Sequence, residues 1–273
     1  MQAEPHSFER IATYTYLYKG CCIAYAEDML TVGQNMPEVR PTVVVGVPRL
    51  FEKVYSAVME NVLASSPLKR KIFFWATSVG RDFGQRNLRG EPIPKFLEFK
   101  RKIAHKLVFS KIIAKTGGRI RFFISGAAPL SVSIMKWYKK MGITILQGYG
   151  MTEDCIISHF NLPDDNRIGT VGKPVQGVSA KLSPEGEICI KNECLTKGYY
   201  KSPEETAKVF DKDGYLKTGD IGEYDHDGYL TITGRVKDQF KTDKGKYISP
   251  APIELELSKN PNIEQLCVVG MGI

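Results

Sequence analysis

The stretch RIRFFISGAAPLSVSIMKWYKKMGITILQGYGMTE, residues 119–153, decides the fold that the sequence predicts. RIRFFIS and GITIL have the apolar, β-branched and aromatic composition of buried strands. The segment after Pro129 is interpreted as a helix, with apolar Val132, Met135 and Trp137 among lysines. A strand, a helix and a second strand in this order imply a βαβ unit and therefore a parallel sheet.

The chain before this stretch also alternates between helix and strand. CCIAYA, residues 21–26, is interpreted as a short buried strand. LTVGQNMPEVR, residues 30–40, is interpreted as a helix that leads to the strand PTVVVGVP, residues 41–48. Long helical patterns then run from about residue 50 to 115, with a break near residues 90–94.

The texture changes from Arg167 onward, where glycine, proline and aspartate recur and the strand-like segments are short. This texture predicts antiparallel strands joined by tight turns. EYDHDGYLTI, residues 223–232, is a predicted hairpin with Asp227–Gly228 in its turn. After about Val236 we expect a lysine-rich loop, a helix over residues 252–259 and a strand QLCVVG, residues 265–270.

The predicted fold class is therefore α/β, in three parts. Residues 1–166 form an α/β part built on a parallel sheet, and residues 167–236 form a β-rich subdomain. Residues 237–273 begin a small α+β domain.

Two loops follow the two strands of the βαβ unit. SGAAPLS, residues 125–131, comes after RIRFFIS, and QGYGMTE, residues 147–153, comes after GITIL. Because one helix separates the strands, we expect them to be neighbours in the sheet. Ligands of open α/β sheets bind at the carboxyl ends of the strands, so both loops are predicted to border one site.

The side chains of these loops suit a nucleotide. Gly126–Ala128 carry almost no side chain, so a flat base can approach the backbone. Tyr149 offers an aromatic face for stacking, and Thr152 offers a hydroxyl to a phosphate oxygen. Glu153 offers a carboxylate to Mg²⁺. A glycine-rich turn with a capping Thr–Glu pair is the better explanation for either loop alone, whereas the two together favour the site.

Two further residues could contact a ribose. Asp220 stands between glycines in KTGDIG, and Arg235 follows the predicted strand YLTIT. A carboxylate can accept hydrogen bonds from both ribose hydroxyls and an arginine can add donors, although a turn aspartate and a surface arginine are commoner. DKDG and DHDG, residues 211–214 and 225–228, resemble calcium loops, but their glycine stands too early, so β-turns are predicted.

Composition and charge exclude several classes of protein. The chain is 42% hydrophobic, and no apolar run reaches the ~20 residues of a membrane helix. The N-terminus lacks the apolar stretch of a secretory signal. The six cysteines fit neither a zinc site nor a disulfide framework, so we expect reduced thiols in a cytoplasmic protein.

Basic residues concentrate between Lys95 and Arg119, in a chain of net charge +8. The solvated face of an amphipathic helix is the favoured interpretation. A face that contacts anionic lipid is the alternative, which would make the protein membrane-peripheral. No nucleic-acid-binding motif is present, so nucleic acid is not predicted as a partner.

The motifs resemble those of a known family. QGYGMTE looks like the YGxTE motif of adenylate-forming enzymes, and residues 186–250 resemble the family's next long block almost position by position. HSFER, residues 6–10, and two blocks over residues 39–55 and 108–131 resemble the long-chain fatty acyl-CoA ligases in particular. The resemblance covers essentially the whole chain. It implies an N-terminal region of α/β subdomains with a β-rich subdomain, joined by a hinge to a small mobile C-terminal domain.

The resemblance also implies roles for individual residues. Catalytic roles fall on Thr152, which contacts the α-phosphate, on Glu153, which holds Mg²⁺, and on Lys241. Lys241 and Gly245 lie in the stretch that serves the coenzyme A step, Lys237 matches the hinge, and His6 matches a histidine near the acyl pocket. The implied nucleotide-binding residues are Gly126, Ala127, Ala128, Gln147, Gly148, Tyr149, Gly150, Met151, Thr152, Asp220, Ile232 and Arg235.

The reaction that the resemblance implies has two steps, with ATP and coenzyme A as substrates and Mg²⁺ as cofactor. A fatty acid carboxylate attacks the α-phosphate of ATP and releases pyrophosphate, and the thiol of coenzyme A then displaces AMP. The phosphate-gripping loop of the family would lie before Met1 and its second lysine beyond Ile273, so this chain alone is expected to turn over poorly.

Three hypotheses remain open on the sequence. The preferred one is part of a long-chain fatty acid–CoA ligase. The others are a ligase for an aryl or short-chain acid, and a non-catalytic AMP-binding module. A chain that exposes core surface is expected to self-associate, so a homodimer also stays open.

Overall fold

The computed structural model describes residues 7–28, 31–242, 247–257, 263 and 266–270. The chain divides into two compact units, Met1–Gln147 and Gly148–Ile273. None of the helices in the described ranges is long and apolar enough to cross a membrane. The predicted division into three parts, at residues 166 and 236, stays a prediction.

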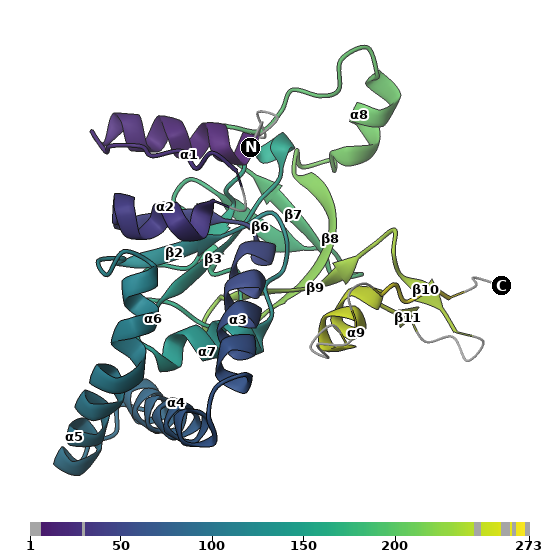
Figure 1. The fold of residues 1–273 in the computed structure, drawn as a ribbon. Coiled ribbons are helices and arrows are strands. Elements are labelled where there is room, and N and C mark those ends of the chain that lie inside the picture. Colours follow the sequence, from purple (N-terminus) through teal and green to yellow (C-terminus); the bar gives the residue numbers. More distant parts are fainter. Residues whose placement is uncertain (1–6, 29–30, 243–246, 258–262, 264–265, 271–273) are drawn as a thin grey trace. The chain divides into compact units, whose positions relative to one another are not determined.

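The first unit is built on a parallel sheet (Figure 1). Its strands are β1 (Val43–Gly46), β2 (Phe122–Ser125) and β3 (Ile145–Tyr149), which continues into the second unit. β2 lies between β1 and β3 and pairs in parallel with both, which confirms the predicted βαβ unit. The helical elements are α1 (Ser7–Tyr18), α2 (Val32–Val39), α3 (Pro48–Leu63), α4 (Pro67–Leu88), α5 (Lys95–Ala104), a π-helical turn η1 (His105–Phe109), α6 (Ser110–Lys115) and α7 (Val132–Lys140).

Local sequence explains where several of these helices begin. α3 and α4 each start with a proline, whose missing N–H and fixed φ suit the first helical turn. The break between α4 and α5 coincides with the predicted one and contains Gly90 at φ +64° and two prolines. The predicted strand over residues 21–26 is wrong, because these residues form no strand and all but Ile23 are exposed.

Aromatic side chains join the helices of the first unit to its sheet. The Phe51 ring of α3 packs edge-on against Phe123 of β2, with ring centroids 5.5 Å apart, and against Tyr138 of α7. The Tyr138 hydroxyl donates to the Phe51 carbonyl at 3.1 Å, and burial raises the pKa of that hydroxyl. α4 packs closely on α7, since Gly80 lies directly against the Lys140 carbonyl.

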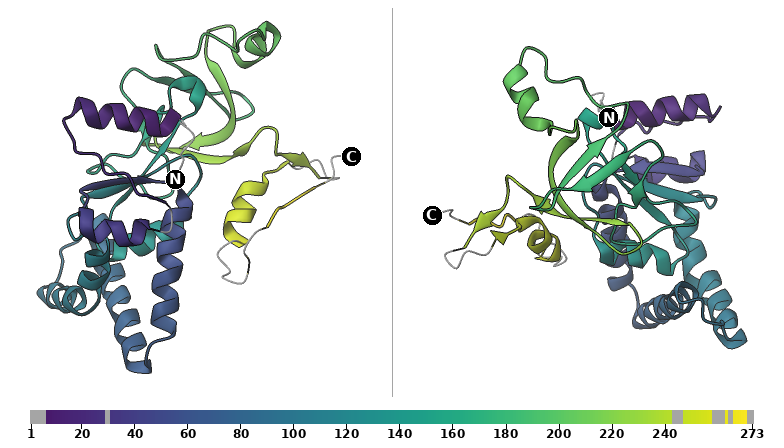
Figure 2. Two further views of the ribbon diagram at one scale, coloured as in Figure 1. Left: turned by 45° about the horizontal axis from the view of Figure 1, so that its top comes forward. Right: turned by 180° about the vertical axis from the view of Figure 1, so that it is seen from behind.

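The second unit contains an antiparallel sheet in the order β6 (Ser179–Leu182), β7 (Glu187–Lys191), β8 (Leu216–Tyr224) and β9 (Leu230–Arg235). β8 is strongly curved, and its register shifts between Ile221 and Gly222 (Figure 2). The remaining elements are η2 (Thr152–Asp154), β4 (His159–Phe160), β5 (Lys173–Pro174), α8 (Pro203–Val209), β10 (Phe240–Lys241), β11 (Tyr247–Ile248) and α9 (Pro250–Leu257).

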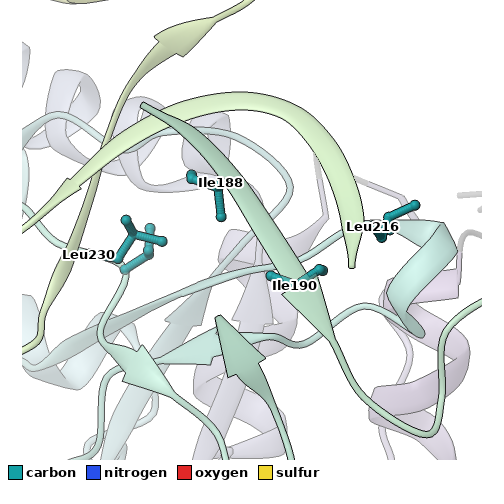
Figure 3. Close-up of a cluster of buried hydrophobic side chains, with 5 residues drawn as sticks. Ile188, Ile190, Leu216 and Leu230 are labelled. Carbon is teal, nitrogen blue, oxygen red and sulfur yellow. The ribbon is translucent and has the colours of Figure 1, made fainter. Parts of the chain in front are cut away.

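A cluster of branched aliphatic side chains forms the core of this unit (Figure 3). Its members are Val171, Ile188, Ile190, Leu216 and Leu230. They come from β7, β8, β9 and the loop after β4, so the cluster holds the sheet to that loop. Tyr149, Met151 and Ile232 pack against the same cluster, which brings three residues predicted for the nucleotide site onto one core.

The two calcium-like segments are turns, as predicted. Asp211 Oδ1 accepts backbone hydrogen bonds from Asp213 and Tyr215, and Asp225 Oδ1 accepts them from Asp227 and Tyr229. Each carboxylate is therefore used by its own turn. The last helix begins at Pro250, two residues earlier than predicted. The predicted final strand is wrong for residues 266–270, which form no strand.

Candidate functional site

The loop QGYGMTE leaves β3 under tight steric limits. A Cβ at Gly148 would lie 2.7 Å from the Phe160 ring, and one at Gly150 would lie 2.8 Å from the Ile157 nitrogen and closer still to the Ile156 carbonyl. Both glycines are therefore required by the packing of the second unit itself. Gln147, the residue before them, is buried on β3.

A buried carboxylate shapes the turn that follows Gly150. Asp154 is 2% exposed, and its Oδ1 accepts hydrogen bonds from the backbone nitrogens of Met151 and Ile156, both at 2.9 Å. Burial raises the pKa of Asp154. Cys155 and Ile156 both have positive φ, 60° and 88°. Because a β-branched residue rarely adopts such a φ, the surrounding contacts must impose this backbone.

This turn presents the two polar residues predicted to act on phosphate and metal. Thr152 is exposed and Glu153 half-buried, both in η2. The Tyr199 hydroxyl donates to Glu153 Oε1 at 2.9 Å, and the Glu153 carbonyl accepts from the Thr196 nitrogen at 2.7 Å. Burial raises the pKa of Tyr199, and the hydrogen bond to Glu153 raises it further. The Glu153 side chain is thus held in place by the loop before α8.

Three predicted nucleotide residues meet through two hydrogen bonds. The Tyr149 hydroxyl donates to Asp220 Oδ2 at 2.7 Å, and Arg235 Nε donates to Asp220 Oδ1 at 3.1 Å. Asp220 and Arg235 are also register partners on β8 and β9. Burial raises the pKa of Tyr149, and the neighbouring charge of Asp220 raises it further. We call this group, Tyr149, Asp220 and Arg235, the clasp.

The clasp carries charge near solvent. The Asp220 side chain is 15% exposed and that of Arg235 is 69% exposed. The guanidinium of the ion pair therefore faces solvent, whereas its carboxylate is largely buried. Hydrogen-bond donors and acceptors for a polar ligand are available on both groups.

The other predicted loop belongs to the first unit. Ser125 and Gln147 are register partners on β2 and β3, so the two loops start from paired residues, as the sequence predicts. Gly126 is buried, and a Cβ there would lie 3.0 Å from the Phe8 ring. Ala127 has a positive φ of 68°, and Ala127 and Ala128 are exposed.

The remaining predicted residues lie on β9 and beyond. Ile232 is half-buried on the core of the second unit, and Lys237 is exposed in the turn that follows β9. Lys241 is exposed on β10, with its Nζ 5.6 Å from the centre of the Tyr247 ring. His6 and Gly245 lie outside the described residues.

Magnesium is the cofactor that the sequence predicts, with Glu153 as its ligand. Within the described ranges, no group of three or more His, Cys, Asp or Glu side chains could hold a metal ion. A single carboxylate fits Mg²⁺ where substrate phosphates and water supply the other oxygens. The single carboxylate of Glu153 therefore fits a Mg²⁺ ion that binds together with a nucleotide.

Sequence reasoning missed four residues that shape this site: Asp154, His159, Tyr199 and Tyr224. His159 of β4 is fully buried, and its Nε2 lies 2.7 Å from the Tyr224 hydroxyl of β8. Of the four, only Asp154 had a local signal, as an acidic residue next to a turn.

Comparison with known proteins identifies the family. The family model described as AMP-binding enzyme matches residues 5–200. The chain is 37% identical over 268 residues to the long-chain-fatty-acid–CoA ligase FadD15 of Mycobacterium bovis, a match that covers 97% of this chain and 44% of that protein. The chain thus spans less than half the length of the curated relatives that it matches.

Solved structures agree with this fold. ATP-bound MatB from Rhodopseudomonas palustris has a TM-score of 0.63 at 28% identity, over 92% of this chain and 42% of that one. MenE from Bacillus subtilis, in complex with the acyl-adenylate intermediate OSB-AMP, has a TM-score of 0.67 over 97% of this chain and 46% of that one. At 19% identity the second likeness shows the fold alone. These matches confirm the predicted α/β fold class, and the chain belongs to the AMP-binding enzyme family.

Proposed function

We propose that this chain is the adenylate-binding part of a long-chain fatty acid–CoA ligase. The observation that carries the proposal is the clasp beside the Glu153 turn, on a motif that resembles YGxTE. Relatives named long-chain-fatty-acid–CoA ligase, at 36–37% identity, support the acyl class. In this proposal the Tyr149 ring stacks on adenine, with Ile232 nearby, and the polar groups of Asp220 and Arg235 bind the ribose.

The proposed site would act by positioning and by neutralising charge. Thr152 is exposed and would donate its hydroxyl to an α-phosphate oxygen. Glu153 would hold Mg²⁺, which would neutralise phosphate charge as the fatty acid carboxylate attacks and pyrophosphate leaves. Tyr199 holds the Glu153 carboxylate before any ion arrives. Coenzyme A then displaces AMP, a step to which we assign Lys241 and Gly245, with Lys237 as the hinge.

Nucleotide binding tests the proposal directly. AMP is titrated into the purified chain and into its Tyr149→Ala variant, with binding followed by calorimetry. We expect the variant to bind about fivefold to 150-fold more weakly, because base stacking on an aromatic ring contributes about 1–3 kcal/mol. Equal affinities would remove Tyr149 from the site. No binding of AMP by the unaltered chain would reject the proposed function.

The acyl substrate needs a separate test. The chain is mixed with nonhydrolysable acyl-adenylate analogues that carry a palmitoyl, an acetyl or a benzoyl group. Tightest binding of the palmitoyl analogue supports the long-chain class. Preference for the benzoyl or acetyl analogue would instead assign the site to an aryl or short-chain acid.

Contact with an anionic membrane, the alternative interpretation of the basic segment, is a second proposal that the exposed side chains of α5 support. On α5, Phe96 and Phe99 are 67% and 59% exposed, and Lys95 and Lys102 are exposed beside them. Exposed aromatic and basic side chains on one helix suit an anionic bilayer surface. Co-sedimentation with phosphatidylglycerol vesicles, and its loss in Phe96→Ser/Phe99→Ser, tests this. A cytoplasmic location and a homodimer stay predictions, the latter testable by analytical ultracentrifugation.

A further inference from the structure

A chain of polar groups in the second unit links Tyr149 of the clasp to Tyr224 through two buried residues, Ser158 and His159. His159 is 0% exposed, and its Nδ1 lies 2.9 Å from Ser158 Oγ. Ser158 Oγ donates to the Tyr149 carbonyl at 3.3 Å. On its other side, His159 Nε2 lies 2.7 Å from the Tyr224 hydroxyl. A continuous path therefore joins Tyr224 of β8 to the backbone of Tyr149.

The direction of each hydrogen bond in this chain follows from its ends. A carbonyl oxygen can only accept, so with Ser158 Oγ donating to Tyr149 we assign the tautomer in which His159 Nδ1–H donates to Ser158 Oγ. In this tautomer His159 Nε2 carries no proton and accepts from the Tyr224 hydroxyl. Burial lowers the pKa of His159 to about 4, which keeps the ring in this neutral form near pH 7.

Two rungs connect the β3–β4 hairpin to β8. Tyr149 and His159 are register partners in the hairpin, with ring centroids 6.0 Å apart. Tyr149 reaches Asp220 on β8, and His159 reaches Tyr224, four residues further along that strand. Each rung is a hydrogen bond of 2.7 Å between the hairpin and the same strand, so loss of the second rung leaves the hairpin tied to β8 by one side-chain bond fewer.

We propose that His159 and Tyr224 are positioning residues of the nucleotide site, which set the placement of Tyr149 against Asp220. This inference rests on the proposed function, since it assigns a role relative to the adenylate. His159 is enclosed by protein, so it acts through Tyr149 and not on the ligand. Removal of the second rung loosens the first and weakens nucleotide binding.

The test compares two substitutions that each remove one tyrosine hydroxyl from the second unit. Tyr224→Phe breaks the rung to His159. The matched control is Tyr229→Phe, which removes the hydroxyl that donates to Asp165 and leaves both rungs intact. Both variants are titrated with AMP, and circular dichroism verifies that both are folded.

We expect the Kd for AMP to rise about threefold to tenfold in Tyr224→Phe, as for the loss of one hydrogen bond, and to stay within about twofold in Tyr229→Phe. His159→Gln, whose amide oxygen can accept from Tyr224, is expected to bind AMP more tightly than His159→Phe. A folded Tyr224→Phe that binds like Tyr229→Phe overturns the inference while leaving the proposed function intact. An unaltered chain that binds no AMP defeats the proposed function, and this inference with it.

Discussion

Replacing Gly150 by alanine tests how the turn that carries Thr152 and Glu153 is built. The new Cβ would overlap the Ile156 carbonyl, a backbone atom that cannot rotate away. Relief requires the turn to move off Asp154, whose Oδ1 accepts from the nitrogens of Met151 and Ile156. Hydrogen bonds to a carboxylate contribute about 1.5–3 kcal/mol each, so loss of both destabilises the second unit by about 3–6 kcal/mol.

The assay must report on the second unit alone. Both tryptophans, Trp75 and Trp137, lie in the first unit, so tryptophan fluorescence is unsuitable. Amide hydrogen exchange of β7 and β8, measured by mass spectrometry in native buffer, reports the opening free energy of the sheet. Gly150→Ala should speed this exchange by about two to four orders of magnitude, which corresponds to about 3–6 kcal/mol.

A second glycine provides the control. Gly84 lies inside α4, and a Cβ there would meet no atom within 4 Å. Gly84→Ala is expected to stabilise that helix by about 1 kcal/mol and to leave exchange in β7 and β8 unchanged. Exchange in Gly150→Ala within about threefold of the unaltered chain, less than 1 kcal/mol, would refute this account of the turn.

Three further outcomes are expected. The pKa of His159 is about 4 in the folded chain against 6.5 for an ordinary histidine, so the unfolded chain protonates first; its contribution to stability is full above pH 6.5 and falls by about 3 kcal/mol as the pH drops to 4. The free energy of unfolding, measured with urea across this pH range, should fall less steeply with decreasing pH in His159→Gln than in the unaltered chain. Leu230→Ala should lower the free energy of unfolding by about 2–5 kcal/mol through a cavity in the core, seen as a lower urea midpoint. Arg235→Ala should change stability by less than about 1 kcal/mol, since the Arg235 side of the ion pair is 69% exposed and Asp220 keeps its bond from Tyr149; a larger loss of stability, measured by thermal denaturation, would contradict that.

Strand pairing could be predicted from local sequence where a short connection joins the two strands. RIRFFIS and GITIL are separated by one helix, and the structure pairs them in parallel. The hairpin turn at residues 225–228 fixes the register of the adjoining ends of β8 and β9. A one-residue register shift between Ile221 and Gly222 then places Asp220 opposite Arg235. Short connections of this kind leave few alternatives for the chain to adopt.

Segments whose structure depends on a distant partner could not be predicted in the same way. Residues 21–26 have the composition of a strand, but no strand in the described part of the chain pairs with them, so the strand predicted from their apolar pattern is wrong. The bond from Tyr149 to Asp220 joins residues 71 positions apart. A single buried histidine in CIISHFNL has no spacing signal, and its role depends on Tyr224, 65 positions later.

The left-handed backbone at Cys155 and Ile156 limits how far the motif can be transplanted. Residues 147–153 alone would not keep their shape in a foreign scaffold, since a strained pair of about 1–3 kcal/mol per residue relaxes once its supports are gone. A functional graft must include Asp154, which holds the turn, and Phe160 of β4, which packs over Gly148. The smallest portable module therefore runs through the β3–β4 hairpin and is longer than the signature by which such enzymes are recognised.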